Sequence, residues 1–127
     1  MVNDMIGVWD MVHDDWRGAL TIKPSDQRLI GNDDVCTYTS WVIEGSYVQE
    51  GSTVSSSMHG TFGGEDTNSR ISSPCKQTGH LISFTINFPN AKPQQFTGYL
   101  FTHNKRTMAG YTWWEGIPFG WYATKRS

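Results

Sequence analysis

The stretch that most constrains the fold is the last third of the chain, residues 94–125, which reads QQFTGYLFTHNKRTMAGYTWWEGIPFGWYATK. It contains three runs rich in aromatic residues, Thr and Gly, and two short turn sequences, at residues 103–105 and 115–116, separate these runs. None of the runs repeats its apolar residues with the period of a helix. Two tight hairpins in succession predict a meander of antiparallel β-strands.

Upstream of this stretch, runs of β-type residues recur at short intervals. We expect strands over residues 5–12, 18–23, 28–31, 39–50, 54–62 and 80–88. The last of these runs alternates the apolar side chains of Ile82, Phe84 and Ile86 with polar ones, which is typical of a strand with one buried face. Pro24 begins a predicted turn, and Gly45 indicates a bulge or the close approach of a neighbouring backbone.

The number and length of these runs predict an all-β fold made of one domain. The chain has 127 residues, and its aromatic content of 13% suits half-buried strands better than helices. Eight or nine strands with short connections predict one antiparallel up-and-down β-barrel over residues 1–127, because closure removes exposed sheet edges. A β-sandwich of two sheets is the alternative. Residues 63–79 are expected to form a long polar surface loop, since Ile71 is their one large apolar residue.

Charge, hydropathy and cysteine usage bear on partners and compartment. The formal net charge is −2 and the Lys and Arg residues are scattered, so we expect no nucleic-acid partner. No apolar run is long enough to span a bilayer, so we expect no membrane partner either. The first residues lack the features of a signal peptide, which predicts a cytoplasmic location. Cys36 and Cys75 are expected to be free thiols, whereas a disulfide between them would indicate an oxidising compartment and a secreted protein.

Several short motifs are similar to those of one group of barrels. The GVW at residues 7–9 resembles the G-x-W of the first calycin strand, and the VIEGSY at residues 42–47 resembles the fourth strand. The QQFTGY at residues 94–99 and the FGWYATK at residues 119–125 are similar to a Thr-rich strand and to the closing strand of avidin-like proteins. The chain thus resembles the calycin family of avidin-like and lipocalin-like barrels. This resemblance implies an up-and-down barrel with a ligand pocket in its lumen.

The resemblance does not extend to the biotin site. Avidin-like proteins hold the ureido group of biotin with an Asn and a Ser near the first turn and a Tyr and a Ser on the third strand. The corresponding segments here are HDDWR at residues 13–17 and NDD at residues 32–34, and the closing strand lacks the family's Asp. The Thr-Asp-Tyr motif of lipocalins is absent too. We therefore expect the fold and the lumenal pocket, but not biotin binding.

Aromatic side chains are the main candidates for ligand binding. The chain has six Trp residues, which is more than one small lumen holds. Trp113 and Trp114 are adjacent, so on a strand they face opposite sides of the sheet. An outward Trp covers a neighbouring strand or forms a subunit interface, whereas an inward Trp gives a stacking platform for a sugar ring or a flat heterocycle. The candidate ligand-binding residues are Trp9, Trp16, Tyr38, Trp41, Gln94, Phe96, Arg106, Tyr111, Trp113 and Trp121.

The predicted function is the binding of a carbohydrate-like or heterocyclic small molecule at the barrel mouth, without a cofactor. Amides such as that of Gln94 would fix the polar groups of the ligand. Arg106 would hold an anionic group if it faces the mouth. Binding is expected rather than catalysis, because the sequence contains no nucleophile elbow, phosphate loop or metal-ligand spacing.

Two other functions stay open. A small barrel enzyme of the cyclase, isomerase or decarboxylase type would use polar groups in the lumen, and the candidates are His13, Asp14, Tyr38 and Arg106. The first two of these lie in a predicted polar turn over residues 13–18, where a solvated position is favoured. An interaction module would instead use outward Trp and Tyr side chains to form a homo-oligomer.

Overall fold

The computed structural model describes residues 4–32, 37–63 and 81–126. At Pro24 and at residues 26–32 and 37–39 it describes the backbone alone. Both cysteines and, apart from its first residue, the predicted loop at residues 63–79 lie outside the described residues. Within the described ranges, no helix is long and apolar enough to cross a membrane.

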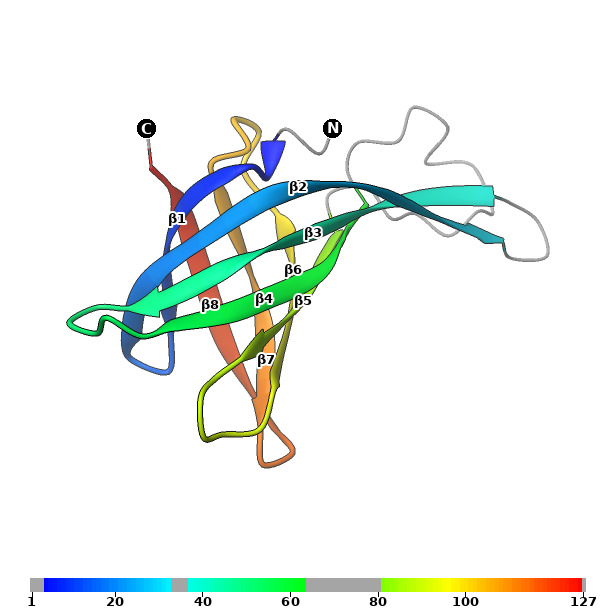
Figure 1. Ribbon diagram of the computed structural model, residues 1–127. Coiled ribbons are helices and arrows are strands. Elements are labelled where there is room, and N and C mark those ends of the chain that lie inside the picture. The colour runs from blue at the N-terminus through cyan, green and yellow to red at the C-terminus, as the bar shows by residue number, and fades with distance from the viewer. Residues whose placement is uncertain (1–3, 33–36, 64–80, 127) are drawn as a thin grey trace.

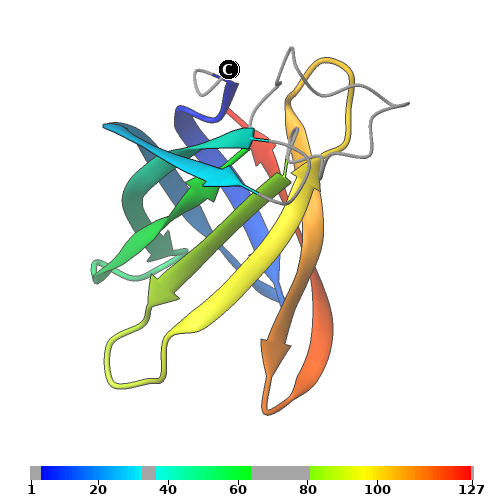
Figure 2. The same cartoon turned by 90° about the vertical axis from the view of Figure 1, so that its right-hand side faces the viewer.

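Eight antiparallel strands in the described part of the chain form one closed barrel. In chain order they are β1 (Gly7–His13), β2 (Trp16–Asn32), β3 (Thr37–Gln49), β4 (Ser55–Phe62), β5 (Leu81–Asn87), β6 (Gln94–Leu100), β7 (Thr107–Trp114) and β8 (Ile117–Lys125). Each strand pairs with the strands before and after it, and β1 also pairs with β8 (Figures 1 and 2). The predicted all-β up-and-down barrel is therefore confirmed, and the two-sheet sandwich is not the fold.

The predicted terminal meander is present at the expected positions. Strands β6, β7 and β8 pair in sequence, and the turn segments at residues 103–105 and 115–116 connect them. On β5 the side chains of Ile82, Phe84 and Ile86 are buried, as their alternation predicts. These local patterns identified the strands because the two faces of a barrel wall have opposite polarity.

The predicted turn at Pro24 is wrong, because β2 continues through it. The pairing of β2 with β3 changes register between Pro24 and Arg28 and then resumes, up to the pair of Asn32 with Thr37. Proline cannot donate a ladder hydrogen bond, and an irregularity in the ladder is one of the few places in a sheet that accepts it. The two strands predicted on either side of Pro24 are thus one long strand. Its distal part forms, with β3, a two-stranded ribbon that projects from the barrel (Figure 1).

Side chains fill the middle of the lumen. Inward-facing residues alternate with outward-facing ones along each strand, as a barrel wall requires. The largest fully buried side chains are those of Trp9, Tyr47, Phe62, Phe84, Phe96, Met5, Met11, Leu20, Ile22, Ile43, Met58 and Ile82. The central lumen is therefore a packed hydrophobic core and not a channel.

Inward-facing glycines let the wall curve and make room for a large ring. A Cβ atom at Gly45 would overlap the carbonyl oxygen of Thr21 on β2, and one at Gly110 would overlap that of Thr97 on β6. The close approach expected at Gly45 is thus confirmed. Trp121 pairs with Gly110 across β7 and β8, and its buried indole nitrogen donates to Thr97 O at 3.2 Å.

Candidate ligand-binding site at the barrel mouth

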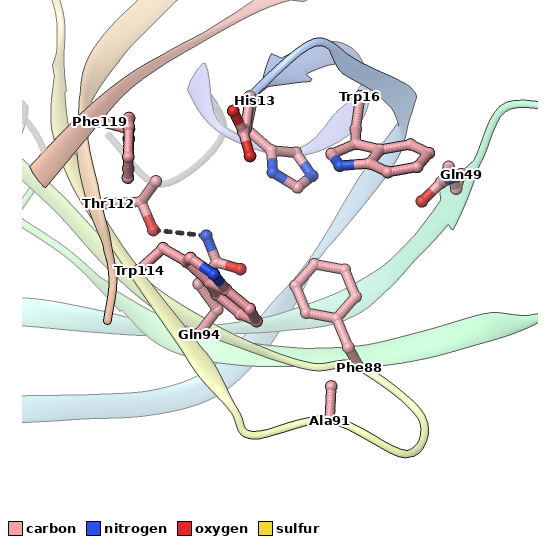
Figure 3. Close-up of a pocket in the computed structure, with 10 residues that line it drawn as sticks. His13, Trp16, Gln49, Phe88, Ala91, Gln94, Thr112, Trp114 and Phe119 are labelled. Atoms are coloured by element: carbon pink, nitrogen blue, oxygen red, sulfur yellow. Dashed lines mark hydrogen bonds between the residues drawn. The ribbon is translucent and has the colours of Figure 1, made fainter. Parts of the chain in front are cut away.

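A cavity of about 290 Å³ opens at the barrel end where the β1–β2, β3–β4, β5–β6 and β7–β8 connections lie. Most of its lining residues are the inward-facing residues of the strands that lie nearest to that end of the barrel. The lining residues are His13, Asp14, Trp16, Gln49, Phe88, Ala91, Gln94, Thr112, Trp114 and Phe119 (Figure 3). The cavity therefore lies directly above the packed core, as a hollow in the mouth of the barrel.

A two-residue turn places His13 and Trp16 beside the cavity. Asp14 and Asp15 both have a positive φ, at 47° and 64°, which is typical of the tight turns that join antiparallel strands. The turn is thus shorter than the predicted segment at residues 13–18, and His13 pairs with Trp16 within the β1–β2 ladder. Because His13 follows Trp9 and Met11 on the inward face of β1, its side chain points into the barrel.

His13 forms part of the cavity floor within a group of aromatic rings. Only 6% of His13 is exposed, and its ring centre lies 5.7 Å from that of Tyr47, 5.9 Å from that of Phe88 and 5.4 Å from that of Phe96. Burial lowers the pKa of His13, and the neighbouring Asp14 carboxylate opposes this shift only in part. The expectation of a solvated His13 is therefore wrong, and the imidazole is held in its neutral form.

Two polar atoms are buried near this end of the barrel without a hydrogen-bond partner among the described residues. His13 Nε2 and Tyr47 Oη make no hydrogen bond with any residue that the structure describes. Burial also raises the pKa of Tyr47 to about 12, so its hydroxyl keeps its proton. An unpaired buried polar group costs on the order of 1–3 kcal/mol, and such groups are uncommon in folded proteins.

Gln94 and Thr112 form a hydrogen-bonded pair on the opposite side of the floor. Gln94 Nε2 donates to Thr112 Oγ1 at 2.9 Å, and Thr112 Oγ1 donates to the carbonyl oxygen of Gln95 at 2.7 Å. Both side chains are buried and face inward from β6 and β7. Figure 3 shows the amide group of Gln94 with its nitrogen toward Thr112 and its oxygen on the side of Phe88.

Aromatic rings form the walls of the cavity. Trp16 and Trp114 stand at the rim, with 53% and 47% of their surfaces exposed. Phe88 and Phe119 complete the apolar lining below and beside them. Rings arranged in this way provide faces for stacking, while the amides and the hydroxyl provide directional hydrogen bonds.

Of the ten predicted binding residues, the structure places two in the lining of the cavity, Trp16 and Gln94. Phe96 and Trp121 lie in the core beneath them, with ring centres 6.0 Å apart. Trp9 is buried near the start of β1, where its Nε1 donates to Met5 O at 2.9 Å.

Four of the remaining five predicted residues lie away from the cavity lining. Arg106 precedes β7 at the other end of the barrel, and its Nη2 donates to Lys125 O at 2.9 Å. Trp41 is half-buried on β3, and the side chain of Tyr38 lies outside the described residues. Tyr111 and Trp113 are exposed and pack edge to face with ring centres 4.7 Å apart. Trp113 borders a neighbouring surface hollow of about 420 Å³ instead.

Residues outside that set complete the site. His13, Phe88, Thr112, Trp114 and Phe119 line the cavity from inward-facing positions. The position of Phe88 could have been found from the sequence, because it continues the alternation of Ile82, Phe84 and Ile86. The adjacency of the two Trp residues on β7 predicted one inward and one outward ring. The parity of the strand shows that Trp114 is the inward one, on the face of Thr112.

Stability should depend on the protonation of His13. The folded pKa lies below the ordinary value of 6.5, so the unfolded chain binds a proton first as the pH falls. The stabilising contribution of neutral His13 is complete above about pH 6.5 and is lost as the pH falls through the folded pKa. We expect the free energy of unfolding, measured with urea between pH 8 and pH 5, to fall less steeply in His13→Phe than in the unaltered protein.

The matched control is His103→Asn, because His103 is exposed in the β6–β7 turn. This variant should keep the pH dependence of the unaltered protein. Equal slopes in His13→Phe and the unaltered protein would contradict a neutral, buried His13.

Comparisons of the chain with protein-family models, with curated proteins and with solved structures found no match.

Proposed function

We propose that this protein is a small-ligand-binding β-barrel that holds a carbohydrate-like or heterocyclic molecule at its mouth. The observation that carries the proposal is the cavity of about 290 Å³, which has aromatic walls and is also lined by the buried polar side chains of His13, Gln94 and Thr112. A purely structural barrel end would be expected to fill this space with apolar side chains, as the middle of the lumen does. The sequence resemblance to avidin-like and lipocalin-like barrels, which bind ligands in this region, supports the same function.

The volume of the cavity limits the size of the ligand that it can hold. Pockets for drug-sized ligands measure about 300–1,000 Å³, and this cavity of about 290 Å³ lies just below that range. It therefore suits a single ring or a pair of fused rings. A larger ligand would extend past Trp16 and Trp114 into solvent.

A second candidate function has one observation in its favour. His13 is a buried, neutral imidazole beside the cavity, and a neutral imidazole can act as a general base. A barrel enzyme of the cyclase, isomerase or decarboxylase type would use such a group. Of the other residues predicted for this role, Asp14 is in the lining and Arg106 is at the other end of the barrel. Mass spectrometry on a bound ligand after prolonged incubation tests the idea, and recovery of the ligand unchanged would count against it.

The adjacent Trp residues of β7 provide the test of mouth binding. Trp114 borders the cavity, whereas Trp113 faces the outside of the barrel. We expect Trp114→Leu to weaken ligand binding by about two- to tenfold, since an aromatic stacking contact contributes about 0.5–1.5 kcal/mol. Titration of the full chain with monosaccharides and fused heterocycles, followed by Trp fluorescence, would measure this.

Trp113→Leu is the control and should bind within about twofold of the unaltered protein, because it leaves the cavity lining intact. Trp114 borders the neighbouring hollow as well, so a loss in Trp113→Leu equal to or larger than that in Trp114→Leu would move the site to that hollow. If no compound of either class changes the emission at millimolar concentrations, the proposed function is wrong.

A further inference from the structure

The hydrogen bonds around Thr112 determine which end of the Gln94 amide faces the cavity. A hydroxyl group has one proton to donate, and the 2.7 Å contact with the carbonyl oxygen of Gln95 uses it, because a carbonyl can only accept. Thr112 Oγ1 must therefore accept in its contact with Gln94, and the partner must be Nε2 of the amide. If the amide were rotated by 180°, Gln94 Oε1 would face Thr112 Oγ1, and two acceptors would meet without a proton between them. Gln94 Oε1 is thus held away from Thr112, on the cavity side, as an acceptor (Figure 3).

The charges around the cavity oppose an anion. The lining residues that the structure describes include no Lys or Arg, and the one formally charged side chain among them is the carboxylate of Asp14. His13 adds no positive charge, because burial lowers its pKa. Arg106, the residue expected to hold an anionic group, lies at the other end of the barrel and donates to Lys125 O. A ligand that donates a proton in a hydrogen bond and carries no negative charge fits this setting.

The number of polar groups favours a heterocycle over a sugar. A sugar ring presents several hydroxyl groups, each of which needs a partner when it is buried. Thr112 Oγ1 already donates once and accepts once, which leaves Gln49, Gln94 and His13, besides the Asp14 carboxylate and the two indole N–H groups at the rim. The rest of the inner lining is mainly aromatic, and its ring faces suit a flat ligand.

We propose that the mouth cavity selects a flat, uncharged nitrogen heterocycle whose ring N–H donates to Gln94 Oε1. This inference rests on the proposed function, since it names the ligand class of the same site. The ring stacks on the aromatic walls, and its edge meets the amide oxygen in the plane of the ring. His13, as a neutral imidazole, is the second group that meets the edge of the heterocycle.

Three fused-ring probes and one sugar test the inference on the full chain. Benzimidazole has the ring N–H, 1-methylbenzimidazole lacks it, and benzimidazole-5-carboxylate adds a negative charge. We expect benzimidazole to bind about tenfold more tightly than either analogue, because the analogues leave the amide oxygen unpaired or bring a carboxylate near Asp14. Glucose should bind more weakly than benzimidazole. Ligand-observed NMR titrations at pH 7.5 measure all four, and this comparison needs no variant.

Two neighbouring glutamines on β6 provide the matched variants. Gln94→Met keeps the length of the side chain but removes the acceptor, so the preference for benzimidazole over 1-methylbenzimidazole should fall to about twofold or less. Gln95→Met should keep the preference, because Gln95 faces outward, where its Nε2 donates to Ser83 Oγ at 3.4 Å. If Gln94→Met does not fold, Thr112→Val frees the amide to turn and should reduce the same preference.

The possible results of these binding experiments have different consequences for the proposed ligand class and for the proposed function. Tight binding of benzimidazole that depends on Gln94 supports the inference. Equal binding of the N–H and N-methyl probes, with loss in Trp114→Leu, overturns the inference and leaves ligand binding at the mouth intact. Preferential binding of glucose overturns it in favour of the carbohydrate class. Failure of every probe to bind at millimolar concentrations overturns the inference together with the proposed function.

Discussion

Replacement of Gly45 by alanine is expected to destabilise the protein by roughly 3 kcal/mol or more. Gly45 faces the lumen from β3, and the carbonyl oxygen of Thr21 on β2 occupies the place where a Cβ atom would lie. A backbone carbonyl cannot rotate away as a flexible side chain can, so the added methyl group would force β2 and β3 apart where they are paired. Urea unfolding followed by Trp fluorescence should show a lower midpoint with an unchanged slope.

Gly120→Ala is the control for this substitution. Gly120 faces outward from β8, and the nearest atom to its added Cβ would be Gly110 O, at 3.9 Å. Its free energy of unfolding should stay within about 0.5 kcal/mol of that of the unaltered protein. A midpoint for Gly45→Ala equal to that of Gly120→Ala would contradict the close approach of β2 and β3.

The second large effect is expected for Phe96→Ala, which should cost about 3–5 kcal/mol. Phe96 is fully buried, stacks on Phe84 at 5.1 Å between ring centres, and meets the ring edges of His13 and Trp121. Its removal leaves a cavity that these three rings cannot fill, because they are held by their own strands. Thermal and urea unfolding would both measure the loss.

Tyr99→Ala on the same strand is the control for Phe96→Ala. Tyr99 faces outward with 53% of its surface exposed, so its loss should cost less than about 1 kcal/mol. A smaller effect for Phe96→Ala than for Tyr99→Ala would mean that the core does not lie inside the barrel. Phe96→Ala should also weaken mouth binding, because Phe96 supports His13 from below.

Local patterns predicted most of the strands, and one proline misled the prediction. The alternation on β5 and the turn sequences at residues 103–105 and 115–116 are local properties, so they could be recognised without knowledge of the fold. Pro24 is also a local signal, and it is usually a sign of a turn. Its effect here depends on the register of β3, which provides an irregularity in the ladder that accepts it. No property of the residues around Pro24 shows that irregularity.

Predicting the site was harder than predicting the fold. Most of the predicted ligand-binding residues are aromatic. Of these, Trp9 and Trp121 belong to the core, and Tyr111 and Trp113 face outward. Whether an inward ring lies in the middle of the lumen or at its mouth depends on how far along the barrel axis each strand is displaced. That displacement is set by the pairing of all eight strands together.

The antiparallel meander and the alternation of the strand faces follow from the amino-acid sequence alone, because both depend on neighbouring residues in one strand or turn. The sequence also shows that Trp113 and Trp114 face opposite sides. Which of the two rings faces the cavity follows from the closure of β8 onto β1, which local sequence does not show. The terminal stretch that predicts the meander therefore serves two surfaces. Trp114 belongs to the barrel mouth and Trp113 to the outside, because closing the sheet turns one face of β7 inward.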